Sequence, residues 1–108
     1  MYTEKDFTAI KDVIINSIPE TVGVILFGSY AKGTAREESD MDFAILTKRN
    51  LERPEKLKVL TDLRWEIARM GYNADFLVKN EAEFLSEKEL PSISKVIFQE
   101  GVELWRKM

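Results

Sequence analysis

The sequence contains no cysteine and no histidine among its 108 residues. Disulfide bonds, thiolate nucleophiles and imidazole general bases are therefore excluded within the chain, as are zinc sites and Ser-His-Asp triads. Any chemistry must use carboxylates, hydroxyls, amines and backbone groups. The absence of cysteine permits a reducing compartment, and the cytoplasm is the location that we expect.

Long hydrophobic runs and an excess of basic charge are also missing. No apolar run exceeds four residues, as in Val24 to Phe27, which is too short to span a membrane. The first residues do not have the pattern of a signal peptide. The 16 basic and 19 acidic residues are interspersed and give a net charge of -3. Without a basic stripe, direct binding of nucleic acid is not expected, and neither is a membrane partner.

The composition that is present is that of a globular chain with a real core. Hydrophobic residues make up 44% of the chain and charged residues 32%. The length suits one compact domain spanning residues 1–108, and no internal repeat, low-complexity tract or linker divides it. Such a domain has no room for a separate substrate domain.

Apolar spacing near the N-terminus predicts an amphipathic helix. Phe7, Ile10, Ile14 and Ile18 follow one another at spacings of three, four and four residues. Thr3 can cap this helix, which we expect to end near Pro19.

Three short apolar segments predict strands over residues 22–27, 41–46 and 72–78. In the second strand, Asp40, Asp42 and Ala44 share one face, while Met41, Phe43 and Ile45 share the other. A helix opened by Pro54 and stopped by Gly71 separates the second and third strands. The predicted buried residues of this helix are Leu57, Leu60, Ile67 and Met70.

A helix between two strands indicates a crossover, so the second and third strands should be parallel in one sheet. As neighbours, they would bring Asp40, Asp42 and Asp75 to the same end. The tail predicts a solvated helix over 81–89, a helix over 92–100 and an edge strand over 102–105. The predicted fold class is α/β with α+β-like character: a single domain with a small mixed sheet of about four strands flanked by helices.

The segment from Gly28 to Asp42 carries the most specific pattern. Its glycine spacing is that of a phosphate-binding P-loop, but Thr34-Ala35 stands where Lys-Ser or Lys-Thr is required. A calcium loop beginning at Asp40 fails too, because Ala44 and Ile45 occupy positions of a ligand and a glycine.

What remains is Gly28-Ser29, ten intervening residues, and the pair Asp40 and Asp42. Two aspartates on one strand face repel each other, and bridging divalent cations would relieve the repulsion. Magnesium suits carboxylate ligands and keeps positions open for phosphate oxygens. Gly28 allows phosphate to approach the backbone, and Ser29 offers a hydroxyl and an amide.

This segment, GSYAKGTAREESDMDFAIL, resembles the signature of the DNA polymerase beta nucleotidyltransferase superfamily, and most of all its minimal nucleotidyltransferase (MNT) proteins. The later runs 73–77 and 97–102 also match the family. The resemblance implies the nucleotidyltransferase fold and transfer of a nucleoside monophosphate to a hydroxyl, with ATP as substrate and two Mg²⁺ ions. It implies that Asp40, Asp42 and Asp75 are the catalytic metal ligands, with Asp75 closest to the acceptor proton. The implied nucleotide-binding residues are Gly28, Ser29, Lys32, Arg36 and Ser39.

Structural alternatives exist for several of these residues. Asp40 and Asp42 alone could be a solvated strand start, and Ser39 a turn residue. Asp75 could cap a turn or pair with Arg69, although an aspartate in a strand interior is costly without a partner. Solvent-facing roles suit Lys32 and Arg36 equally well. Packing is the expected role of Tyr30, Trp65 and Trp105.

The leading functional hypothesis also follows from the resemblance. Such a protein would be the antitoxin of a HEPN-domain toxin, would form a hetero-oligomer with it and would adenylylate one of its tyrosines. One alternative is an antitoxin that neutralises its partner by binding alone. Another is nucleotidyl transfer to a small molecule, although proteins of that kind usually carry an added substrate domain.

Overall fold

Four strands form one mixed sheet in the computed structural model, which describes residues 1–108. The strand order is β3-β2-β1-β4. β2 and β3 are parallel, whereas β1 runs antiparallel to both β2 and β4. This arrangement confirms the predicted fold class, the parallel crossover and the edge position of the last strand. The strands are β1 (Thr21–Phe27), β2 (Met41–Thr47), β3 (Ala74–Asn80) and β4 (Val102–Arg106).

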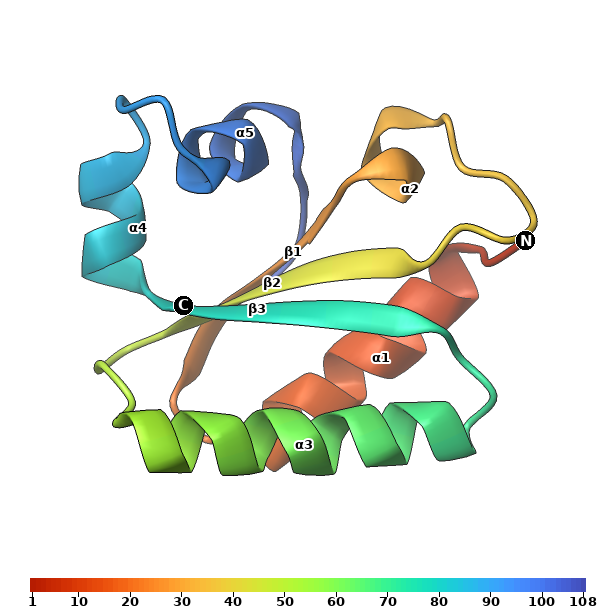
Figure 1. The fold of residues 1–108 in the computed structure, drawn as a ribbon, viewed down its shortest axis with the longest axis horizontal. Coiled ribbons are helices and arrows are strands. Elements are labelled where there is room, and N and C mark those ends of the chain that lie inside the picture. The colour runs from red at the N-terminus through yellow and green to blue at the C-terminus, as the bar shows by residue number, and fades with distance from the viewer.

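Helices α1 (Glu4–Ser17) and α3 (Arg53–Arg69) cover one face of the sheet (Figure 1). The backbone N–H of Thr3 donates to the Asp6 carboxylate at 2.7 Å, which fixes the start of α1. The predicted stripe of α1 is confirmed, because Ile10, Ile14 and Ile18 are buried against the sheet, with Phe7 at their margin.

The buried face of α3 differs from the prediction at two positions. Leu60 and Ile67 are buried, but Leu57 is 54% exposed and Met70 is 45% exposed. Leu63 takes part in the core instead. At 100° per residue, Leu57 lies about a quarter turn away from the stripe formed by the three buried residues. Met70 follows the last residue of α3, where the chain already turns toward Gly71.

The other face of the sheet carries the short helices α2 (Ser29–Lys32), α4 (Glu81–Glu87) and α5 (Ile93–Glu100) (Figure 1). Phe84 of α4 and Ile97 of α5 pack with Ala44 and Leu46 into a second, smaller core. The central strands are therefore buried on both faces, as the apolar run in β1 predicts. The helix predicted over residues 81–89 is present as α4, ends at Glu87, and is solvated except at Phe84, which is buried. None of the five helices combines the length and apolar character that crossing a bilayer requires.

Candidate active site

Asp42 lies where the end of β1 meets the beginnings of β2 and β3. It pairs with Phe27 across the antiparallel ladder and with Asp75 across the parallel ladder. Asp40 is exposed and lies one residue before β2. The sheet thus brings the three aspartates to one end, as the crossover predicted.

Asp75 lies on one side of Asp42, and the backbone of Gly28, directly after β1, lies on the other side. The Gly28 φ of 74° lies in a region that side chains disfavour. A Cβ at Gly28 would lie 2.4 Å from Asp42 Oδ2, so only glycine leaves room for this carboxylate. Ser29 then begins α2, and the amides of Ala31 and Lys32 donate to the Gly28 carbonyl. The Gly28 backbone and the Asp42 carboxylate are therefore close together. A site that holds a phosphate beside a metal-binding carboxylate requires such an arrangement.

The electrostatic environment opposes the charge of Asp42. Partial burial raises the pKa of this carboxyl, and the nearby charges of Asp75 and Asp40 raise it further. A group with this combination of burial and like-charged neighbours in a cleft is a candidate functional residue.

The raised pKa makes a prediction about folding stability. Because the folded state disfavours the Asp42 anion, its stabilising contribution is present below the unfolded pKa of 3.8 and is lost as the pH rises through the folded pKa. The isosteric, uncharged Asp42→Asn variant should therefore unfold at a higher temperature than wild type at pH 7 without divalent cations. Thermal unfolding at pH 7 and pH 3 measures this, and the difference should shrink at pH 3. A lower midpoint for the variant at pH 7 would contradict the assignment.

Asp75 is placed differently from the sequence expectation. Its side chain is 70% exposed near the start of the edge strand β3, so the argument that burial requires a partner does not hold. The basic side chain near it is Arg64 of α3, with Nη2 3.9 Å from Asp75 Oδ1. Pairing with Arg69 is therefore not observed. A loose, exposed ion pair of this kind is weak and leaves the carboxylate accessible.

The donor chemistry of the three aspartates fits magnesium, which prefers carboxylate oxygens. The close approach of Asp42 to the Gly28 backbone also fits a compact site that binds a phosphate and a cation together. As the side chains lie, however, no group of three or more acidic side chains converges closely enough to hold a metal ion. The Asp75 carboxylate is instead directed toward Arg64.

The other predicted phosphate contacts have partners within the chain. Lys32 Nζ lies 3.7 Å from Glu100 Oε2 on α5. The backbone N–H of Arg36 donates to Ser39 Oγ at 2.9 Å, so Ser39 does act as a turn residue. Roles of Lys32, Arg36 and Ser39 toward a nucleotide remain predictions.

The three aromatic residues assigned to packing behave differently from one another. Tyr30 packs against Phe7, with ring centroids 5.8 Å apart. Trp105 packs at the margin of the main core. Trp65 is 64% exposed on α3 and so does not belong to the core.

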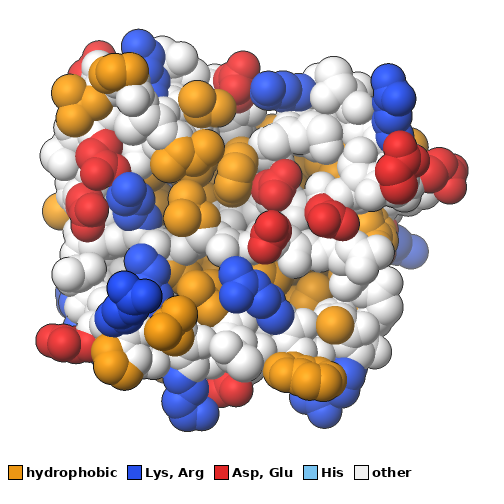
Figure 2. Space-filling view, in the orientation of Figure 1, with side chains coloured by type: hydrophobic (Ala, Val, Ile, Leu, Met, Phe, Trp, Pro, Cys, Tyr) orange, Lys and Arg blue, Asp and Glu red, His pale blue; other side chains and the backbone are white.

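A groove of about 240 Å³ opens directly beside the carboxylates. In Figure 2 a group of acidic side chains lies next to a hydrophobic patch. The groove therefore combines two carboxylates with an apolar wall. Its lining residues are Phe27, Asp42, Asp75, Phe76, Leu77 and Ile93.

Most of the chain matches a known protein family. The family model of the nucleotidyltransferase domain matches residues 10–104, which include every element from the middle of α1 into β4. The chain belongs to the nucleotidyltransferase domain family. The resemblance found in residues 28–42 is thus confirmed.

One curated relative supports the same assignment. The nucleotidyltransferase is 47% identical over 57 residues to a Methanocaldococcus jannaschii protein named "Putative protein adenylyltransferase MJ1305". The match covers 50% of this chain and only 38% of the relative, so the chain spans well under half of that protein's length.

Solved structures show the same fold at low sequence identity. A toxin-antitoxin with AMP-PNP has a TM-score of 0.65 and 20% identity, covering 99% of this chain and 76% of that chain. A tri-AMPylated Shewanella oneidensis HEPN toxin in complex with MNT antitoxin gives 0.61 and 18%, covering 96% and 72%. These similarities establish the architecture of the nucleotidyltransferase.

Sequence reasoning missed the apolar wall of the groove. Leu77 shares a strand face with Asp75, and this alternation was the one available signal. Ile93 lies 18 residues after Asp75, at the start of α5, and no local pattern connects it with the aspartates.

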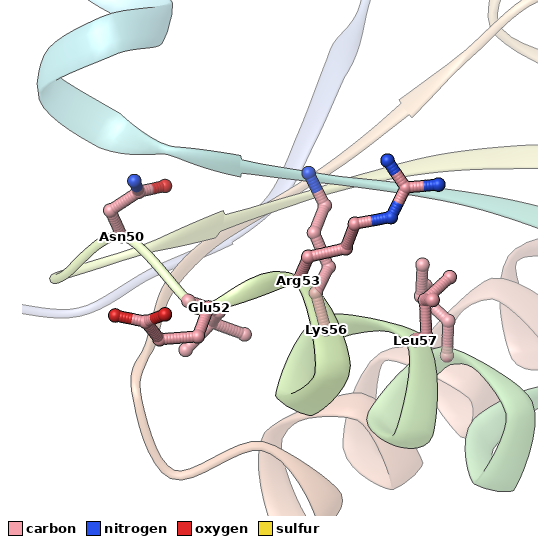
Figure 3. A pocket seen from close by; sticks show the side chains of 7 residues that line it. Asn50, Glu52, Arg53, Lys56 and Leu57 are labelled. Carbon is pink, nitrogen blue, oxygen red and sulfur yellow. The ribbon is translucent and has the colours of Figure 1, made fainter.

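The largest cavity of the nucleotidyltransferase is elsewhere. It measures about 570 Å³ and lies around the start of α3, with Asn50, Arg53 and Lys56 in its wall. Figure 3 shows Arg53 and Lys56 extending from α3 toward the sheet. This cavity follows the C-terminal end of β2, whereas Asp42 lies near the opposite end of the same strand. It contains none of the predicted site residues.

Proposed function

We propose that this nucleotidyltransferase transfers AMP from ATP to a tyrosine hydroxyl of a HEPN-domain toxin and thereby acts as an antitoxin. Residues 1–108 would form the minimal nucleotidyltransferase domain, joined to the toxin in a hetero-oligomer. The observation that carries the proposal is the meeting of the Gly28 backbone with Asp42, and of Asp42 with Asp75, at one end of the sheet.

Each predicted site residue has a role in this proposal. Gly28 and Ser29 bind the triphosphate through backbone and hydroxyl groups, with Lys32, Arg36 and Ser39 as further phosphate contacts. Asp40, Asp42 and Asp75 would hold two Mg²⁺ ions. When bound, the ions would supply Lewis-acid stabilisation of the charge that develops on the phosphate oxygens.

Asp75 is the residue best placed to receive the proton of the acceptor. Its carboxylate is largely exposed on the edge strand, so a hydroxyl from another molecule can reach it. In the reaction, the acceptor oxygen forms a bond to the α-phosphorus, and the bond from this phosphorus to the bridging oxygen breaks. Pyrophosphate leaves, and the hydroxyl proton passes to the Asp75 carboxylate.

The names of the similar proteins support the choice of acceptor. One matched structure contains an AMPylated HEPN toxin with its MNT antitoxin, and the curated relative is named as a protein adenylyltransferase.

Co-expression with a HEPN-domain protein tests the proposal. Intact-mass spectrometry of that protein should show adducts in AMP increments, and fragmentation should place them on tyrosine. The Asp40→Ala, Asp42→Ala double variant should give none. Unmodified toxin beside the wild type would refute the transfer activity. Equal neutralisation by the wild type and the double variant would instead support an antitoxin that works by binding alone.

A further inference from the structure

One side of α5 faces the candidate active site. Ile93, Val96 and Glu100 are spaced by three and four residues and so lie along the same side of the helix; we name them the α5 stripe. Ile93 lines the groove that contains Asp42 and Asp75. At the other end, Glu100 reaches Lys32, three residues after Ser29. The stripe therefore extends along the site from the carboxylates to α2.

Large apolar side chains are unusually exposed in this part of the chain. Six of the eleven exposed large hydrophobic residues fall within residues 85–102. Ile93 lines the groove and is 49% exposed, Val96 of α5 is 41% exposed, and Leu90 in the turn before α5 is 55% exposed. Apolar surface gains about 25 cal/mol per Å² when it is removed from water, so such a concentration marks an interaction surface.

The charges around this surface restrict its partner. Residues 81–100 contain five glutamates and two lysines, and Asp42 and Asp75 line the groove beside Ile93. This excess of negative charge beside exposed apolar side chains complements a protein surface with an apolar centre and basic surroundings.

The geometry of phosphoryl transfer gives the direction from which that protein must come. The attacking and leaving oxygens lie roughly in line on opposite sides of the phosphorus. With the triphosphate held over Gly28 and Ser29, the acceptor approaches from the side of β3 and Ile93. That is the side on which Asp75 is exposed.

We propose that Leu90 and the α5 stripe form the docking surface for the protein substrate. Leu77 and Ile93 then contact the ring of the acceptor tyrosine, so that its hydroxyl reaches Asp75. This assignment rests on the proposed function and adds to it the surface that selects a protein acceptor.

Val96→Lys tests the docking surface, with Trp65→Lys as a matched control. Both positions are exposed on helices, and lysine is a good helix former, so neither change should disturb folding. Trp65 lies on α3, which covers the opposite face of the sheet (Figure 1). Steady-state AMP transfer to the purified HEPN protein should show a KM for that protein at least tenfold higher with Val96→Lys. The KM for ATP should stay within twofold, and Trp65→Lys should match the wild type.

The possible results separate the docking surface from the proposed function. An unchanged KM for the HEPN protein with Val96→Lys would overturn the docking surface while leaving the transfer activity intact. If Val96→Lys raised the KM for ATP instead, the α5 stripe would contact the nucleotide base, and the proposed docking surface would again be overturned. An equal loss with Trp65→Lys would place docking elsewhere. Absence of transfer by the wild type would refute the proposed function, and the docking surface with it.

Discussion

Replacing Asp42 with asparagine is expected to lower the rate of AMP transfer by about 1,000-fold while the protein stays folded. Asp42 is the central carboxylate of the site, since it pairs with Asp75 in the neighbouring strand and lies against the Gly28 backbone. Asparagine keeps the shape of the side chain but removes the negative charge that a cation requires. The same change relieves repulsion among the aspartates, so activity and stability should move in opposite directions.

Transfer of labelled AMP to the HEPN protein under single-turnover conditions measures this effect. Asp62→Asn is the matched control, because Asp62 is a solvent-exposed carboxylate on α3 that pairs with Lys58 at 3.1 Å. The control should retain the wild-type rate. If Asp42→Asn kept more than a tenth of that rate, Asp42 would not be an essential ligand of the reaction.

Gly28→Ala is expected to produce the second large loss, of about 100-fold in transfer rate together with about 1–2 kcal/mol of folding stability. The alanine would keep a φ near 74°, which strains any residue with a Cβ. It would also place that Cβ 2.4 Å from Asp42 Oδ2 and 3.2 Å from Asp42 Cγ. The carboxylate must then turn away from the position opposite Asp75.

Gly33→Ala separates the two causes. Gly33 has nearly the same φ, 77°, but a Cβ there would meet no atom within 4 Å. The Gly33→Ala variant should lose about as much folding stability as Gly28→Ala, because of backbone strain, and should retain most of its transfer activity. Chemical denaturation and single-turnover assays on both variants measure the two effects. Equal activity of the two variants would show that the contact between Gly28 and Asp42 has no role in the reaction.

Local patterns in the sequence were sufficient for most of the fold. Alternation within residues 41–46 placed Asp42 and Ala44 on one face, and the crossover rule placed Asp75 beside Asp42. Both rules act within one strand or one connection, so neither needs knowledge of the whole sheet. The prediction failed at Leu57 and Met70, because which side of α3 meets the sheet is set by packing between distant segments.

The sequence prediction treated Asp75 as a buried residue in a strand interior, with Arg69 as a possible partner, and both points were wrong. The position of β3 in the sheet is relevant to this difference. The sequence does not state which strand is outermost, and burial of a strand residue depends on that order. Asp42, the paired residue in the central strand β2, is partly buried, whereas Asp75 at the start of the edge strand is exposed and near Arg64. The same exposure is what makes Asp75 accessible to an acceptor from another molecule.

The sequence by itself determined which donor groups this protein has available for chemistry and to which family it belongs. Without cysteine or histidine, the available donors were carboxylates, and the spacing of Gly28-Ser29 and Asp40-Met41-Asp42 indicated the family. The tertiary structure alone decided which apolar residues surround those donors. Ile93 joins Asp75 at the groove, and Glu100 meets Lys32, because α5 folds back over the sheet next to α2. These contacts join residues 18 and 68 positions apart in the sequence, and the packing of the complete sheet and its helices determines them.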